Sequence, residues 1–86
     1  GAVKDLKSAG FWIVAASSSN EAQDATKFDW PEKTALILGS EESGIRPLLL
    51  RESDYHIRLP MEPKVESLNV AVASGILAYL WKQRWG

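Results

Sequence analysis

ALILGSEESG (residues 35–44) and LPMEPKVESLNVAVA (residues 59–73) decide the fold of this chain. Each stretch begins in an apolar segment with the composition of a strand, passes through a polar loop and leads into a helical pattern. In a parallel sheet such loops follow the carboxyl ends of the strands, where ligands are expected to bind. The two stretches therefore predict a binding site that is built by two loops.

Apolar runs and helical patterns alternate along the whole chain. The apolar run FWIVAA, residues 11–16, has the length of a strand that is covered on both faces. Two more strands are predicted at 34–38 and 55–59, and helices are predicted at 3–8, 47–52 and 67–84. This alternation is typical of the α/β class and predicts a mainly parallel sheet with helices on both faces.

Single residues mark where some of these elements begin and end. Gly10 follows the first helical stretch and suits the left-handed conformation found just past a helix end. Pro47 suits the first turn of a helix, where its missing N–H costs nothing. The polar residues 17–33 are interpreted as a long connection with a helical turn around 21–25. His56 is expected on a strand, pointing away from the apolar face, and a catalytic role for it is less favoured.

The last helix is apolar on nearly every side. One face carries Leu68, Val72, Ile76 and Tyr79, and another carries Val70, Ala73, Leu77, Leu80 and Trp81. A helix of this kind is buried on two sides. The second face is expected to meet another subunit or a further part of the polypeptide, with Ala71, Gly75 and Ala78 permitting close approach. A core helix of a larger domain is an equally open interpretation.

Length and composition limit what the site can be. A chain of 86 residues forms one compact unit at most and buries roughly 60–65% of its unfolded surface, so oligomerisation would add to its stability. There is no cysteine and one histidine, which excludes a disulfide framework and a thiolate or polyhistidine metal site. The apolar stretch 70–81 is too short to span a bilayer. The chain starts on Gly1 and reads as a piece of a longer protein.

The first of the two loops does not suit a nucleoside triphosphate. Gly39 and Gly44 have the spacing of a phosphate-binding loop, but Ile45 and Arg46 follow where Lys and Ser or Thr are required. The carboxylates of Glu41 and Glu42 would also repel phosphate oxygens. A neutral or cationic ligand with a planar base fits this apolar, carboxylate-edged loop better, although isolated turn residues would give the same pattern.

The sequence resembles the SpoU/TrmH branch of the SPOUT class, RNA 2′-O-ribose methyltransferases that use S-adenosylmethionine. LILGSEESGIRPLLLRESDYHIRLPM is similar to the second motif of that family and LPMEPKVESLNVAVASGILAYL to its third. The resemblance implies that residues 1–86 are the C-terminal part of a trefoil-knot methyltransferase domain. It also implies an obligate homodimer, a structured RNA substrate, ribosomal slightly ahead of transfer RNA, and a cytoplasmic location, or an organellar one in a eukaryote.

The family's functional residues are carried over position by position. The resemblance implies that Leu38, Gly39, Leu59, Met61 and Leu68 border the cofactor. Glu41, Ser67 and Asn69 match the polar positions that the family places near the ribose and the methyl donor, and they are the candidate catalytic residues. Ser67 also suits the cap of the last helix, and the two duties are compatible.

The sequence departs from the family pattern in three places and lacks one motif. Glu42 and Pro63 stand where the family has glycine, which bears on the cofactor contacts, and Ala71 stands where it has serine. The family's first motif, which supplies an arginine proposed to activate the ribose hydroxyl, lies upstream of residue 1. We therefore expect this chain to be inactive by itself.

Two other function classes remain open from the sequence. A non-catalytic α/β interaction module would use the apolar helix and bind no cofactor. A hydrolase would pair Glu41 with Glu62 or Glu66, but no nucleophile pattern accompanies these carboxylates.

The net charge of −1 gives no sign of RNA binding, which usually requires a basic surface. Arg46, Arg51, Arg58 and Lys64 form either a local basic patch or, the favoured interpretation, scattered surface charges.

Overall fold

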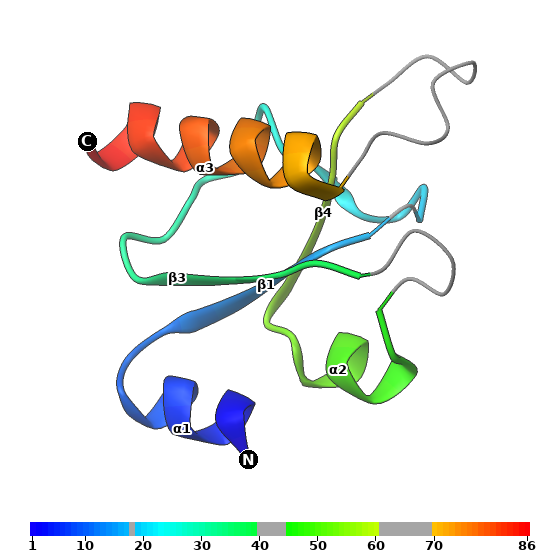
Figure 1. Ribbon diagram of the computed structural model, residues 1–86, viewed down its shortest axis with the longest axis vertical. Helices are drawn as coiled ribbons and strands as arrows, with labels where there is room; N and C mark the ends of the chain where they lie inside the picture. Colours follow the sequence, from blue (N-terminus) through cyan, green and yellow to red (C-terminus); the bar gives the residue numbers. More distant parts are fainter. Residues whose placement is uncertain (18, 40–44, 61–69) are drawn as a thin grey trace.

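Three helices and four strands alternate along the part of the chain that the computed structural model describes, residues 1–17, 19–39, 45–60 and 70–86 (Figure 1). In chain order they are α1 (Ala2–Ser8), β1 (Trp12–Ala16), β2 (Gln23–Asp24), β3 (Thr34–Ile37), α2 (Pro47–Glu52), β4 (Tyr55–Arg58) and α3 (Val70–Trp85). The predicted strands and helices agree with these bounds to within one residue, except at the start of α3. Residues 67–69 of the predicted helix lie outside the described residues.

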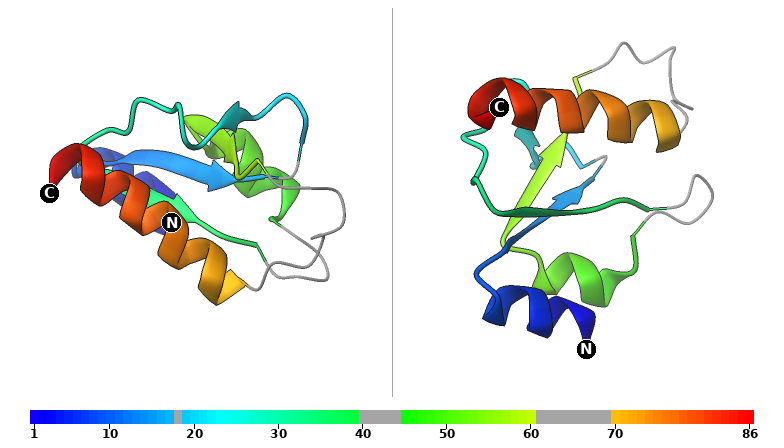
Figure 2. Two further views of the ribbon diagram at one scale, coloured as in Figure 1. Left: turned by 90° about the horizontal axis from the view of Figure 1, so that it is seen from above. Right: turned by 60° about the vertical axis from the view of Figure 1, so that its left-hand side comes forward.

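The four strands form one parallel sheet in the order β2-β4-β1-β3. β1 pairs with β3 from Trp12 opposite Thr34 onward, and with β4 from Val14 opposite Tyr55 onward. Helices α1 and α2 lie on one face of the sheet and α3 lies on the other (Figures 1 and 2). The predicted fold class, a parallel α/β sheet with helices on both faces, is confirmed.

The core is organised around β1. Ile13, Val14 and Ala15 have no exposed surface, as the continuous apolar run predicts for a strand covered on both faces. Val14 belongs to a buried cluster on the α3 side of the sheet that includes Ile57 of β4 and Leu77 of α3. Burial of each of these large aliphatic side chains contributes roughly 1.5–3 kcal/mol.

The helical turn predicted around 21–25 is wrong. Residues Gln23–Asp24 form β2, which pairs in parallel with Ile57 and Arg58 of β4, and the N–H of Ala25 donates to the Arg58 carbonyl at 2.8 Å. The Asp24 carboxylate accepts hydrogen bonds from the Thr26 N–H (2.9 Å) and hydroxyl (2.7 Å). This local turn and the distant strand pairing outweigh the weak helical composition of the segment.

Gly10 and Pro47 have the roles predicted for them at helix ends. Gly10 has a φ of 91°, and its N–H donates to the Lys7 carbonyl while the Phe11 N–H donates to the Leu6 carbonyl, both at 3.0 Å. These two bonds form a Schellman motif that ends α1. Pro47 lies in the first turn of α2, where its fixed φ is already helical. The predicted trefoil knot depends on residues 61–69, which lie outside the described residues.

Replacing Gly10 by alanine is expected to lower the free energy of unfolding by about 1–2 kcal/mol, because an L residue is strained at positive φ. An added Cβ would meet Lys33 atoms at 3.7 Å or more, so the cost arises from the backbone and not from a clash. Urea unfolding of the protein measures the change. Gly10→Asn is the control and should lose less, since asparagine tolerates this conformation; equal losses for both variants would contradict the explanation.

Candidate functional site

The two predicted loops leave the sheet at the same edge. Leu38 and Gly39 follow β3, Leu59 follows β4, and β1 lies between these strands. Leu38 and Leu59 are half-buried and pack against the same buried cluster. β3 and β4 lie on opposite sides of β1. The edge where these strands end is therefore a topological switch point, which is where parallel sheets bind ligands.

Helix α3 starts above this same edge and runs back over the sheet (Figures 1 and 2). Its first described residue, Val70, directly follows the predicted residues Ser67, Leu68 and Asn69. Those three residues, together with Glu41 and Met61, lie outside the described residues. The structure therefore brings Leu38, Gly39 and Leu59 to one edge and leaves the other predicted site residues untested.

Two charged side chains lie beside this edge, on β2 and β4. Asp24 and Arg58 are register partners in the parallel pair. The hydrogen bond from the Thr26 hydroxyl, and then that from the Thr26 N–H, hold the pKa of the Asp24 carboxyl below its usual value. The Arg58 Nε is buried and has no hydrogen-bond partner in the described structure.

Leu38, Gly39 and Leu59, in contrast to these charged residues, offer an apolar surface with backbone polar groups. Such a surface suits a planar base better than a phosphate.

Two polar residues near β4 have structural roles. The Asp54 carboxylate accepts a hydrogen bond from the Ile13 N–H at 2.7 Å, and the Asp54 N–H donates to the Ile13 carbonyl at 2.8 Å. Asp54 therefore extends the β1–β4 pairing. The sequence gives no local signal for this role, because Asp54 precedes the apolar strand. The His56 Nε2 lies 2.7 Å from the Leu50 carbonyl of α2, so this nitrogen is the donor. This contact is on the face opposite buried Ile57, as predicted.

The two faces of α3 have different environments. Leu77 is buried, and Leu80 and Trp81 pack against the core cluster. The face that carries Val72, Ile76 and Tyr79 is exposed, with exposed fractions of 49%, 40% and 60%. The predicted burial of one apolar face is confirmed for the described residues. The second face has no cover within the described structure, so its predicted contact with another subunit or a further part of the polypeptide stays a prediction.

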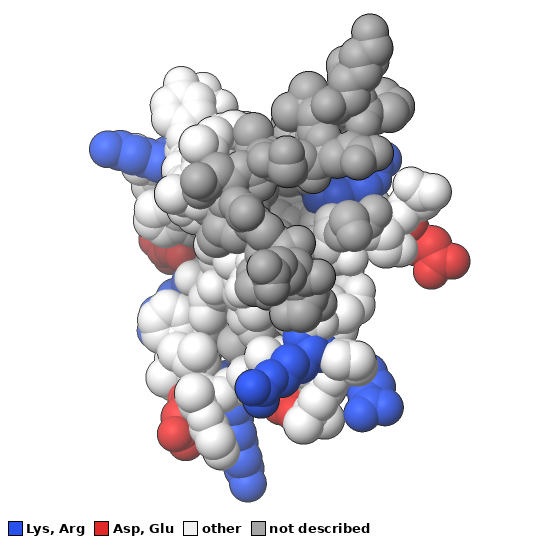
Figure 3. Space-filling view, turned by 45° about the vertical axis from the view of Figure 1, so that its right-hand side comes forward, with Lys and Arg blue, Asp and Glu red and all other residues white. Residues whose placement is uncertain are grey.

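Charged groups do not gather into one patch on the face drawn in Figure 3. Lysine and arginine side chains lie there at several separate places, with acidic side chains among them. Arg46 and Arg51 lie on or next to α2, whereas Arg58 is on β4, and Lys64 lies outside the described residues. Scattered charges, the interpretation that the sequence favoured, fit this surface. Among the described residues, no helix is long and apolar enough to cross a membrane.

The chain matches the model of the SpoU rRNA Methylase family over residues 1–79. The chain belongs to the SpoU family. An uncharacterized tRNA/rRNA methyltransferase of Mycoplasma pneumoniae is 39% identical over 83 residues, which are 94% of this SpoU chain and 34% of that protein. A tRNA (guanosine(18)-2′-O)-methyltransferase of Aquifex aeolicus is 37% identical over 75 residues, 87% of this chain and 36% of that protein. The chain thus spans about a third of the length of these relatives.

Solved SpoU structures have the same fold. The Aquifex aeolicus TrmH/SpoU tRNA modifying enzyme superposes with a TM-score of 0.85 at 34% identity, covering 96% of this chain and 42% of that one. The SpoU methyltransferase AviRb from Streptomyces viridochromogenes, solved in complex with the cofactor AdoMet, gives a TM-score of 0.75 at 29% identity, covering 95% and 33%. These comparisons confirm the predicted family and fold.

Proposed function

We propose that the intact protein transfers a methyl group from S-adenosylmethionine to a ribose 2′-hydroxyl of a structured RNA. The proposal rests on one observation above all: Leu38, Gly39 and Leu59 lie at one edge of a SpoU-family sheet, under the start of α3. This SpoU chain supplies the cofactor pocket and the dimer helix, as the C-terminal part of the methyltransferase domain. Catalysis also requires the upstream region, which carries the activating arginine of the family.

The described part of the pocket fits the adenosine end of the cofactor. Leu38 and Leu59 would cover the two sides of the adenine, and the backbone at Gly39 can approach it closely. Met61 and Leu68 would complete the apolar wall. A SpoU neighbour solved with AdoMet supports this choice of ligand. Bound there, the cofactor would supply the reactive methyl carbon.

The chemical demands on the protein are alignment and removal of one proton. Holding the 2′-oxygen in line with the methyl–sulfur bond is worth about 7–11 kcal/mol of barrier. Help in removing the hydroxyl proton typically adds about 10²- to 10⁴-fold. We assign Glu41, Ser67 and Asn69 to the organisation of the reacting groups, and the activation of the hydroxyl to the upstream arginine. As the new carbon–oxygen bond forms, the methyl–sulfur bond would break and release S-adenosylhomocysteine, and the 2′-hydroxyl proton would pass to a base or to the activating arginine of the upstream region.

Ribosomal RNA is slightly favoured as the substrate over transfer RNA. The segment GIRPLLLRESD, residues 44–54, leans toward the ribosomal group, and the matching family is described as rRNA methylases. The Aquifex aeolicus relative acts on tRNA, so transfer RNA is the second candidate. A non-catalytic interaction module is the alternative function, and it predicts no cofactor binding by the intact protein.

The intact protein is also proposed to be a homodimer that buries the exposed face of α3. The large apolar side chains Val72, Ile76 and Tyr79 are spaced four and three residues apart, so they lie on one face of the helix. Ala71, Gly75 and Ala78 are exposed as well and permit close approach of a second helix. Such an apolar face is typical of a permanent interface.

Alkaline hydrolysis of the RNA product tests the reaction. A 2′-O-methyl group removes the nucleophile that cleaves the adjacent phosphodiester, so a methylated ribose should survive in an alkali-resistant dinucleotide. We expect the intact protein with labelled S-adenosylmethionine to place the label there. Asn69→Ala should lower kcat by about 10²-fold or more without loss of cofactor binding. Asp5→Ala, at an exposed position of α1 on the opposite face of the sheet from α3, is the control and should keep full activity.

Label found in alkali-sensitive nucleotides would show base methylation and contradict the 2′-O assignment. Full activity of Asn69→Ala would contradict the role given to this residue. If isothermal calorimetry finds no binding of S-adenosylmethionine to the intact protein, the proposed reaction is wrong and the non-catalytic interaction module is the better explanation.

Introducing a carboxylate at Ile76 is expected to break the dimer. A buried, unpaired charge costs several kcal/mol, so the dimer dissociation constant of Ile76→Asp should rise by about 100-fold or more. Light scattering after size-exclusion chromatography gives the mass. Leu48→Asp is the matched control, because Leu48 is 57% exposed on α2, across the sheet. An unchanged dimer for Ile76→Asp, or a wild-type monomer, would contradict this interface.

A further inference from the structure

Two tryptophans of α3 hold the connection that leads into β3. The Trp81 Nε1 donates to the carbonyls of Pro31 and Glu32, at 3.1 and 3.0 Å, and the Trp85 Nε1 donates to the Trp30 carbonyl at 2.7 Å. Each tryptophan is about fifty positions away in the sequence from the residues whose carbonyls accept its hydrogen bonds. We call this set of three hydrogen bonds the tryptophan clamp.

The connection held by the clamp is itself fixed from the other side. Trp30 is buried, its Nε1 donates to the Ala25 carbonyl at 3.3 Å, and its ring meets Phe28 edge to face at 5.1 Å. The Thr34 hydroxyl donates to the Pro31 carbonyl at 2.6 Å. The acceptors of the clamp therefore belong to a rigid segment, and the position of α3 is set relative to it.

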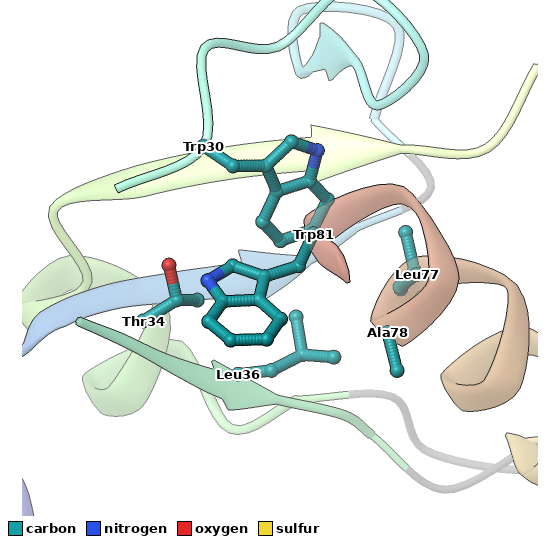
Figure 4. Close-up of a pocket in the computed structure, with 6 residues that line it drawn as sticks. All are labelled: Trp30, Thr34, Leu36, Leu77, Ala78 and Trp81. Carbon is teal, nitrogen blue, oxygen red and sulfur yellow. The ribbon is translucent and has the colours of Figure 1, made fainter. Parts of the chain in front are cut away.

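Apolar packing does not fill the space between α3 and β3. A pocket of about 240 Å³, partly open to solvent, lies there and is lined by Trp30, Thr34, Leu36, Leu77, Ala78 and Trp81. Figure 4 shows the Trp81 indole lying between the helix and the start of β3. A partly empty contact restrains a helix less than a close-packed one. The hydrogen bonds of the clamp lie at this end of the helix. They therefore contribute more to holding α3 against β3 than they would in a close-packed contact.

The clamp and the candidate pocket lie at opposite ends of the same two elements. β3 runs from Thr34, beside the clamp, to Leu38 and Gly39 at the pocket. α3 runs the other way, from Val70 above the pocket to Trp81 and Trp85 at the clamp (Figure 2). Loss of the clamp would therefore let α3 shift relative to β3 at one end, and hydrogen-bonded helices and strands would carry that shift to the pocket at the other end.

We propose that Trp81 is a positioning residue for the cofactor pocket, acting through the hydrogen bonds of its indole to the connection before β3. The inference rests on the proposed function, in which S-adenosylmethionine binds between these walls. The sequence predicts that Trp81 lies on an apolar face of the last helix but does not indicate which backbone groups it contacts. With this clamp, cofactor affinity depends on a contact at the far end of the helix.

The test compares Trp81→Phe and Trp85→Phe in the intact protein. Both variants keep a ring and lose the indole N–H. Trp12→Phe is the matched control, since Trp12 is half-exposed and lies at the start of β1. Calorimetry measures the dissociation constant of S-adenosylhomocysteine, steady-state kinetics measure KM for S-adenosylmethionine and for RNA, and thermal unfolding measures Tm. The loss of a hydrogen bond of this kind is expected to weaken cofactor affinity about three- to tenfold.

We expect both clamp variants to raise the dissociation constant and the KM for the cofactor, with the KM for RNA unchanged, and Trp12→Phe to leave all three unchanged. A lower Tm with unchanged cofactor affinity would show a merely structural role and overturn the proposal. If Trp81→Phe does not fold, Trp85→Phe alone decides in the same way. Failure of the wild-type protein to bind S-adenosylhomocysteine would instead refute the proposed function itself.

Discussion

The structure depends on the burial and two-sided pairing of β1. Ile13, Val14 and Ala15 have no exposed surface, and the strand is hydrogen-bonded to β3 on one edge and to β4 on the other. All strands are parallel, so this single constraint brings the carboxyl ends of β3 and β4 to one edge of the sheet. The candidate pocket exists because the chain returns twice to the same central strand.

Helix α3 links this constraint to the proposed homodimer. Its inner face packs on the core through Leu77, and its outer face exposes Val72, Ile76 and Tyr79. One helix thus covers the sheet, starts at the candidate pocket and carries the exposed apolar face that is proposed to meet a second subunit. This combination explains why a helix so apolar on all sides occurs in a chain with ordinary overall composition.

Much of the fold could be predicted because its signals are local. The run FWIVAA, the turn at Gly10 and the proline at the start of α2 depend on a few neighbouring residues, and each was confirmed. The strand β2 could not be predicted, because two residues with weak propensity pair with β4, more than thirty residues away. The bond from the Ile13 N–H to Asp54 is equally distant in sequence and left no local pattern.

The candidate site was predicted in a different way. Physical reasoning from the sequence placed two loops at the carboxyl ends of strands, and the structure bears this out for Leu38, Gly39 and Leu59. The chemical roles of Glu41, Ser67 and Asn69 came from the family resemblance, and they stay predictions. The tryptophan clamp left no trace in the sequence, because its acceptors are backbone carbonyls, which every residue carries.

Hydrogen exchange of the intact protein, with and without S-adenosylhomocysteine, tests the central claim most directly. The claim is that the ends of β3 and β4 form one binding site. Ligand should therefore slow exchange at Gly39 and at Leu59 together, at the same ligand concentration. Protection at one of these strand ends without the other, or at neither while the ligand binds elsewhere, would contradict the account.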